Sequence, residues 1–172
     1  MRVGIFFGGP SRERETSFII GRTVFDKLDR ALFEPVPLFV DSYGQVIHLN
    51  WRYLYKRSIQ DFFPPVEALP EPEFPTYQES LAERSEEGMD ALREKVGRPL
   101  AWSRLAEHID LAFVTLPGEV VAGESLHQKL EKLGIPYTGS NGKVCRLSAD
   151  QSLFRELLGP QGLYQPPAIT LN

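Results

Sequence analysis

A short loop near the amino terminus carries residue types that could bind a ligand. Gly8 and Gly9 close an apolar run and are followed by PSRERE, residues 10–15. Two glycines directly after a strand permit a tight turn and bring a ligand close to backbone N–H groups at the next helix start. The carboxylate of Glu13 could receive a ligand ammonium group, while those N–H groups could receive an anion. Composition alone favours a simpler interpretation, a solvated turn whose charges pair with one another.

Other patterns in the chain exclude several common sites. The glycine loop has neither the G-x-G-x-x-G spacing of a dinucleotide site nor the Gly-Lys-Ser/Thr of a P-loop. His48, His108 and His127 fall in separate predicted elements, without metal-ligand spacing between them. Cys145 is the one cysteine, which excludes an internal disulfide or a zinc site with two thiolates. We therefore expect no metal or cofactor site within this chain, and we expect Cys145 to be a buried small side chain.

Residues 51–57, WRYLYKR, mix basic and aromatic side chains as a nucleic-acid platform does. The chain as a whole has a net charge of −4, which gives it no electrostatic attraction to nucleic acid or to an anionic membrane. We interpret the segment as a half-buried hairpin or helix whose aromatic residues could equally mark a subunit contact.

The elements that would position the glycine loop alternate between strands and helices. The apolar run Val3–Phe7 predicts a strand covered on both faces. Apolar residues every four positions predict a helix over 16–29, with Thr16 or Ser17 as its N-cap. Residues 34–40 predict a second strand, and the prolines in it indicate an edge position.

Further along, the same patterns predict a short helix over 102–109, a strand over 110–116 and a helix over 126–133 that Gly134 ends. A brief strand is predicted over 135–138. The next helix is predicted to start at Ser148, with Gln151 as its capping-box partner, and to stop at Gly159-Pro160, and residues 165–172 look like the start of a strand.

The segment 42–99 interrupts this alternation. Residues 46–54 could form a hairpin arm or a short helix, and five prolines within 61–75 predict an extended surface excursion. Residues 77–96 are highly charged with a thin apolar stripe, which predicts a solvated or mobile helix.

Together these elements predict an α/β fold, an open and mostly parallel sheet with flanking helices, in which 42–99 is a long irregular or helical insertion. Ligands bind such sheets at the carboxyl ends of the strands, so the candidate loops are 8–15, 116–124 and 139–144. With 172 residues, the chain is predicted to form one domain. No apolar stretch is long enough for a signal peptide or a membrane span, and we expect a cytoplasmic protein.

The glycine loop resembles the opening signature of D-alanine–D-alanine ligases, GG-x-S-x-E-R-E-x-S, which stands here as residues 8–17. Residues 21–24 (GRTV) are similar to the family's S-G-x-x-V, and 133–140 (LGIPYTGS) to its L-G-I-P-Y-x-G-S. The end of the chain, 163–168, resembles the family's junction into its central domain. Order and spacing agree over 2–41 and 100–172, whereas 42–99 carries none of these motifs.

The resemblance implies a Rossmann-like pre-ATP-grasp domain of an enzyme that joins two D-alanines for peptidoglycan synthesis. It implies that Glu13 holds the ammonium group of the first D-alanine, and that Ser11, Gly9 and Gly118 belong to the same substrate-binding surface. The family uses ATP and Mg²⁺, which its other two domains bind. We therefore expect these 172 residues to be inactive by themselves, and we expect a homodimer.

Two motifs of the family are altered. Its H-G-x-x-G-E-D-G loop aligns with residues 117–124, where Pro117 takes the place of the histidine and only Gly118 remains. Glu124 is interpreted as a partner of the following helix dipole. The lysine of the family's M-D-K motif is Gln151 here. These departures leave the identity of the substrate open.

Two other interpretations remain. The chain could be a degenerate ligase-derived fold that serves as a stand-alone interaction or dimerisation module, as the altered loop and the long insertion suggest. More remotely, it could be a nucleotide-binding domain of the flavodoxin type.

Overall fold

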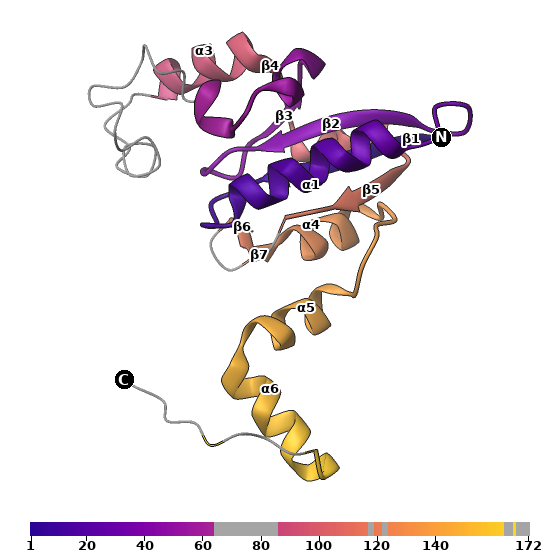
Figure 1. The fold of residues 1–172 in the computed structure, drawn as a ribbon, viewed down its shortest axis with the longest axis vertical. Coiled ribbons are helices and arrows are strands. Elements are labelled where there is room, and N and C mark those ends of the chain that lie inside the picture. Colours follow the sequence, from indigo (N-terminus) through magenta and orange to yellow (C-terminus); the bar gives the residue numbers. More distant parts are fainter. Residues whose placement is uncertain (64–85, 117–118, 122–123, 164–166, 168–172) are drawn as a thin grey trace.

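The computed structural model describes residues 1–63, 86–116, 119–121, 124–163 and 167. Its centre is a five-stranded sheet in the order β4-β3-β2-β1-β5 (Figure 1). β2 and β5 pair with β1 in parallel, and β3 pairs with both β2 and β4 in antiparallel, so β3 alone runs against the other four strands of this sheet. A separate antiparallel pair is formed by β6 and β7. The strands are β1 (Arg2–Gly8), β2 (Glu34–Val40), β3 (Val46–Leu49), β4 (Gly97–Leu100), β5 (Leu111–Val114), β6 (Glu119–Val121) and β7 (Glu124–Ser125).

Helices cover both faces of the sheet and extend beyond it. The α-helices are α1 (Arg14–Lys27), α3 (Glu86–Val96), α4 (Leu126–Leu133), α5 (Gly142–Ala149) and α6 (Gln151–Leu158). The 3₁₀-helices are η1 (Trp51–Tyr55), η2 (Ile59–Asp61), η4 (Trp102–Glu107) and η5 (Gly159–Gln161). None of the described helices is long and apolar enough to cross a membrane.

Two hydrophobic cores lie on opposite faces of β1, because successive side chains of a strand point to opposite sides. Phe7 packs with Phe18 of α1, with ring centroids 5.7 Å apart, in a core shared with η1, η2 and α3. Phe6 packs on the other face with Trp102 of η4, in a core shared with α4. The predicted α/β sheet with helices on both faces is thereby confirmed.

The predicted edge position of β2 is wrong, because β2 lies between β1 and β3. Only Leu38–Val40 pair with β3, whereas all of β2 pairs with β1. Pro35 and Pro37 therefore lie where β2 has no second neighbour, and their missing N–H groups interrupt no bonding to β3.

The insertion is more regular than predicted, since it contributes β3 and β4 to the sheet and also forms η1. Phe62 and Phe63 are fully buried in the core on the α1 face. Met89 and Val96 of α3 join the same core, so the interpretation of this helix as solvated or mobile is wrong for 86–96. The proline-rich excursion lies outside the described residues from 64 onward.

The carboxyl-terminal part differs from the prediction at two helices. The predicted helix start at Ser148 is wrong, because Ser148 lies inside α5. The next helix, α6, follows the N-cap Asp150, whose carboxylate accepts hydrogen bonds from the N–H groups of Ser152 and Leu153. The predicted strand over 135–138 is reduced to one parallel bridge between Tyr137 and Ala112. The predicted strand over 165–172 lies outside the described residues, apart from Pro167. In Figure 1, α5 and α6 extend away from the sheet.

Candidate functional site

The carboxyl ends of β1, β2 and β5 meet at one edge of the sheet, where the glycine loop begins. Gly8 and Gly9 have φ angles of 95° and 83°, a region that side-chain-bearing residues rarely adopt. A Cβ atom on Gly8 would lie 2.5 Å from the carbonyl oxygen of Val40, and one on Gly9 would lie 2.7 Å from Leu116 Cδ2. The loop therefore lies between the end of β2 and Leu116, the first residue of the second candidate loop.

A chain of hydrogen bonds fixes the start of α1 against these strand ends. The N–H of Gly8 donates to Ser17 Oγ at 3.1 Å, and Ser17 Oγ lies 3.2 Å from Thr115 Oγ1. Thr115 Oγ1 donates to the carbonyl of Phe6 at 2.7 Å. The predicted capping role of Thr16 or Ser17 is wrong, because α1 begins at Arg14 and Ser17 lies inside it.

Glu13 stands at the N-cap position of α1 and is exposed at the carboxyl edge of the sheet. Its backbone N–H donates to Ser11 Oγ at 3.2 Å, and the N–H of Arg14 donates to the Ser11 carbonyl at 3.1 Å. Within the described residues, its carboxylate has no hydrogen bond or ion pair. The Glu13 carboxylate is thus exposed at this edge, whereas the backbone N–H groups of Glu13 and Arg14 already donate to Ser11.

Gly9 shapes this loop from a buried position. Its N–H donates to the carbonyl of Val40 at 2.7 Å, so this donor is already satisfied. Ser11 is half-buried and holds the turn through the two contacts that it receives from Glu13 and Arg14. Gly118, the fourth predicted site residue, lies with Pro117 outside the described residues.

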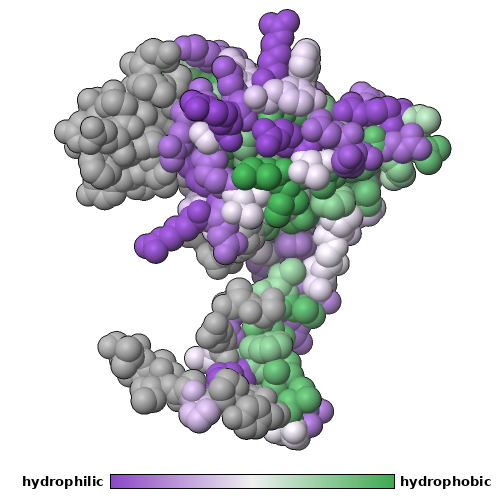
Figure 2. Space-filling view, in the orientation of Figure 1, coloured by the Kyte–Doolittle hydropathy of each residue, from purple (hydrophilic) through white to green (hydrophobic). Residues whose placement is uncertain are grey.

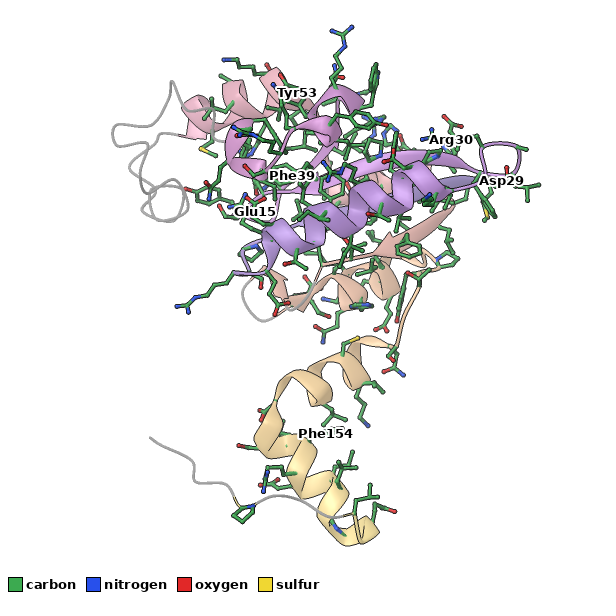
Figure 3. The ribbon with its side chains drawn as sticks, in the orientation of Figure 1. Glu15, Asp29, Arg30, Phe39, Tyr53 and Phe154 are labelled. Carbon is green, nitrogen blue, oxygen red and sulfur yellow. The ribbon has the colours of Figure 1, made fainter. Side chains whose placement is uncertain are left out.

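Glu15 is a polar side chain at this edge to which sequence reasoning gave no role. Its Oε2 accepts from the N–H of Ile59 at 3.0 Å, which ties the first turn of α1 to η2. Its Oε1 is buried without a hydrogen-bond partner within the described residues. Figure 3 shows Glu15 at the end of α1 that faces the candidate site. The alternating charges of residues 12–15 do not indicate in the sequence that the Glu15 carboxylate is the one that turns into the protein.

The second loop continues into β6 and β7, and its acidic residue is engaged within the protein. Glu124 lies 2.7 Å from Lys132 Nζ and 3.3 Å from Lys129 Nζ, both on α4. The hydrogen bond from Lys132 lowers the pKa of the Glu124 carboxyl below its ordinary value. The cap of α4 is instead Ser125, which forms a capping box with Gln128. Glu124 therefore interacts with α4 through ion pairs with Lys129 and Lys132 of that helix.

The third loop is fixed by Glu131 of α4. Glu131 Oε1 accepts from the Tyr137 hydroxyl at 2.6 Å and from the N–H of Gly142 at 3.0 Å. The hydrogen bond to Glu131 raises the pKa of Tyr137 to about 12. These two hydrogen bonds hold the turn that leads into α5. The loop predicted over 139–144 ends at Gly142, because α5 begins there.

The remaining candidates are not gathered into a site. Within the part of the chain that the structure describes, no three His, Cys, Asp or Glu side chains are placed to hold a metal ion. Cys145, expected to be buried, is only half-buried, and its thiol donates to the Ser140 carbonyl. Residues 51–55 form η1, which buries Leu54 and exposes more than half of Trp51 and Tyr55, as the half-buried interpretation predicts.

Comparisons with known proteins agree with this geometry. Residues 2–140 match the family model described as "D-ala D-ala ligase N-terminus". The chain is 28% identical to D-alanine–D-alanine ligase A of Escherichia coli K12, over 100% of this chain and 44% of that protein. It therefore spans less than half the length of this curated relative.

Solved structures show the same fold. The D-alanine–D-alanine ligase from Coxiella burnetii superposes with a TM-score of 0.62 at 19% identity, covering 94% of this chain and 42% of that one. VanG D-Ala:D-Ser ligase from Enterococcus faecalis superposes with a TM-score of 0.60 at 20% identity, covering 96% and 43%. With a family model that matches most of its length, the chain belongs to the family of D-alanine–D-alanine ligase amino-terminal domains.

Proposed function

We propose that this chain is the substrate-side domain of an ATP-dependent ligase that joins D-alanine to a second amino acid for peptidoglycan synthesis. The observation that carries the proposal is the exposed Glu13 carboxylate at the carboxyl edge of three parallel strands, where α/β sheets bind their ligands. The family membership supports it, and the order of the motifs does not favour the stand-alone interaction module.

The chemistry of Glu13 suits an amino acid substrate. An ionised carboxylate and an ammonium group form charge-assisted hydrogen bonds, which are about twice as strong as neutral ones. In this proposal Glu13 binds the ammonium group of the first amino acid and fixes its orientation. The carboxyl group of the same substrate is then left for activation.

The other three site residues act around Glu13. Ser11 Oγ holds the backbone N–H of Glu13, so it orients the carboxylate through the main chain. Gly9 allows the loop to pack against Leu116, the first residue of the second loop. We infer that Gly118, two residues after Leu116, lines the same surface. Pro117 has no side-chain donor for a substrate carboxylate, so this contact would have to come from elsewhere.

ATP and Mg²⁺ are expected for the whole ligase, with ATP supplying the phosphoryl group that activates the carboxyl group. Among the described residues, no three His, Cys, Asp or Glu side chains are placed to hold a metal ion. The resemblance to the family assigns ATP and Mg²⁺ to its other two domains, so we expect the 172 residues by themselves to lack ligase activity. A cytoplasmic homodimer is part of the same proposal.

The product of the complete gene that encodes this chain tests the proposal. We expect it to release ADP from ATP in the presence of Mg²⁺ only when D-alanine is added. Replacing D-alanine by D-serine as the second substrate tests whether the altered second loop changes the choice of partner. ATP hydrolysis that does not depend on any D-amino acid would contradict the proposal.

A further inference from the structure

An open groove of about 770 Å³ lies at the end of the sheet opposite Glu13. Its lining includes Arg30, His48, Trp51, Arg52 and Arg98, which come from the segment after α1, from β3, from η1 and from β4. Figure 3 shows Arg30 and Glu15 near opposite ends of α1, so the groove and the candidate substrate site are well separated. Its volume is within the range of pockets that hold small ligands.

The groove concentrates positive charge in a chain that is acidic overall. Three arginines and one histidine line it, and no carboxylate does, whereas the whole chain has a net charge of −4. Within the described residues, the guanidinium groups of Arg30, Arg52 and Arg98 form no ion pair. Arg30 instead donates to the carbonyl of Phe25 at 2.9 Å and lies 4.4 Å from that ring's centroid. All three arginines are exposed and open to a ligand.

The pairing of β3 with β4 places two of these residues directly opposite each other. His48 faces Arg98 in the antiparallel register. Arg98 at this position disfavours the positively charged, protonated form of His48. Burial lowers the pKa of His48 most, and the nearby His108 and Arg98 lower it further, while Glu34 acts in the opposite direction. The neutral imidazole is therefore favoured in the unliganded groove, and an anion beside His48 would favour its charged form.

We propose that this groove binds a small multiply charged anion through Arg30, Arg52 and Arg98. The guanidinium group is planar and matches the oxygen atoms of a phosphate or carboxylate with two parallel hydrogen bonds. Trp51 is 57% exposed beside these arginines and offers a ring face on which a flat part of the ligand could stack. The site differs from the proposed substrate site in position and in the charge of its ligand.

Titration calorimetry of the 172-residue chain tests the proposal with two probes, inorganic pyrophosphate and citrate. We expect binding at one site per chain for at least one probe, with affinity that falls as salt is raised. Binding of pyrophosphate alone would identify a phosphate ligand, binding of citrate alone a polycarboxylate, and binding of both a site that selects by charge. Binding of neither probe at low salt would overturn the proposal.

Substitutions locate the binding. The double variant Arg52→Gln, Arg98→Gln is expected to weaken binding about 10-fold or more, because it removes two charge-assisted contacts from exposed positions. The matched control is Arg57→Gln, whose side chain is 95% exposed and which does not line the groove. Circular dichroism confirms that each variant is folded. Equal affinities for the double variant and the unmodified chain would contradict the assignment to this groove.

The histidines provide an independent signal. A bound anion beside His48 favours the imidazolium form, so the pKa of His48 measured by NMR is expected to rise when the probe is added. His127 on α4 does not line the groove and serves as the internal control. A probe that binds but leaves both histidines unchanged, or shifts them equally, would place the anion elsewhere and overturn the proposal.

Discussion

At the residue scale, the path from β1 into α1 depends on two glycines and on the hydroxyl groups of the buried Ser17 and the half-buried Thr115. Gly8 and Gly9 adopt a left-handed backbone where the loop approaches β2 and Leu116 most closely. Ser17 and Thr115 then bridge the helix to the ends of β1 and β5. The position of the Glu13 carboxylate follows from these contacts, because Glu13 is the residue that joins the loop to the helix.

Alanine substitutions of the glycines test this view. Gly8→Ala is expected to lower the free energy of unfolding by about 2 kcal/mol or more, since its Cβ meets backbone and its φ is strained. Gly9→Ala is expected to cost less, because its Cβ meets only the end of the Leu116 side chain. Gly159→Ala is the control, with no atom within 4 Å of its Cβ. Urea unfolding measures all three, and equal stability of Gly8→Ala and Gly159→Ala would contradict the account.

A second prediction at this scale concerns pH. Arg2 donates to the Asp110 carboxylate through its side chain and its backbone N–H, which lowers the pKa of Asp110 to about 2. The unfolded value is about 3.9, so this pair stabilises the fold above pH 4 and the contribution is lost as pH falls towards 2. Asp110→Asn is expected to reduce stability at pH 7 and to flatten this acid dependence. Urea unfolding between pH 7 and pH 2 measures it, with Glu94→Gln as control. An unchanged slope would refute it.

The sequence singled out Glu13 and the glycines through its resemblance to the ligase family, whereas composition alone favoured a solvated turn. It could not assign Ser17, since a serine near a helix start caps the helix in one context and bonds to another element in a different one. The pairing with Thr115 joins residues that are far apart along the chain. Such long-range partners leave no local pattern.

At the element scale, α3 is attached to the end of β2 by a buried ion pair. Asp41 is fully buried, and its Oδ2 accepts from Arg93 Nε at 2.8 Å. Its Oδ1 accepts from the N–H groups of Tyr43 and Gln45 in the turn before β3. One carboxylate thus holds the turn and the helix together, and this contact anchors the insertion to the sheet.

Removing the cation tests the anchor. Arg93→Met leaves the Asp41 carboxylate buried without its partner, and we expect the free energy of unfolding to fall by about 3–5 kcal/mol. The control is Arg104→Met, which breaks an ion pair with Glu107 whose side chains are both more than half exposed. Such a surface pair contributes less than about 1 kcal/mol. Equal losses of stability in the two variants, measured by urea unfolding, would show that Arg93 does not anchor the helix.

The sequence predicted β1, α1, β2, β5 and α4 because their apolar runs or four-residue repeats are continuous. It did not predict β3 and β4 as strands of the main sheet. Each has four residues, and their pairing joins segments separated by the whole excursion from 50 to 96. Pro99 further obscures β4, although a proline is tolerated there because β4 is an edge strand.

At the scale of the whole molecule, α5 and α6 present an apolar surface outside the two cores. Figure 2 shows hydrophobic side chains along this part of the molecule. The exposed apolar residues here are Val144, Leu153, Phe154, Leu157 and Leu163, each 42–56% exposed. Contiguous exposed apolar surface of this kind marks an interaction site or an aggregation risk. We therefore expect the exposed side chains of this surface to contribute little to the stability of the sheet.

The double variant Leu153→Gln, Leu157→Gln tests this separation. Because both side chains are already half exposed, we expect the free energy of unfolding to change by less than about 0.5 kcal/mol. We expect the fluorescence of an added apolar dye such as ANS to decrease. Leu38→Gln, a substitution at a fully buried strand position, is the contrasting case and is expected to be strongly destabilising. A large loss of stability in the double variant would mean that α6 belongs to a core.

We propose that Glu13 binds the ammonium group of the first amino acid substrate. The most direct test is the KM for the first D-alanine, measured in the product of the complete gene with Glu13→Gln and, as a control, Glu94→Gln on α3. Loss of a charge-assisted contact predicts a KM about 10- to 100-fold higher for Glu13→Gln and an unchanged KM for Glu94→Gln. An unchanged KM in Glu13→Gln, in a folded and active enzyme, would contradict the account.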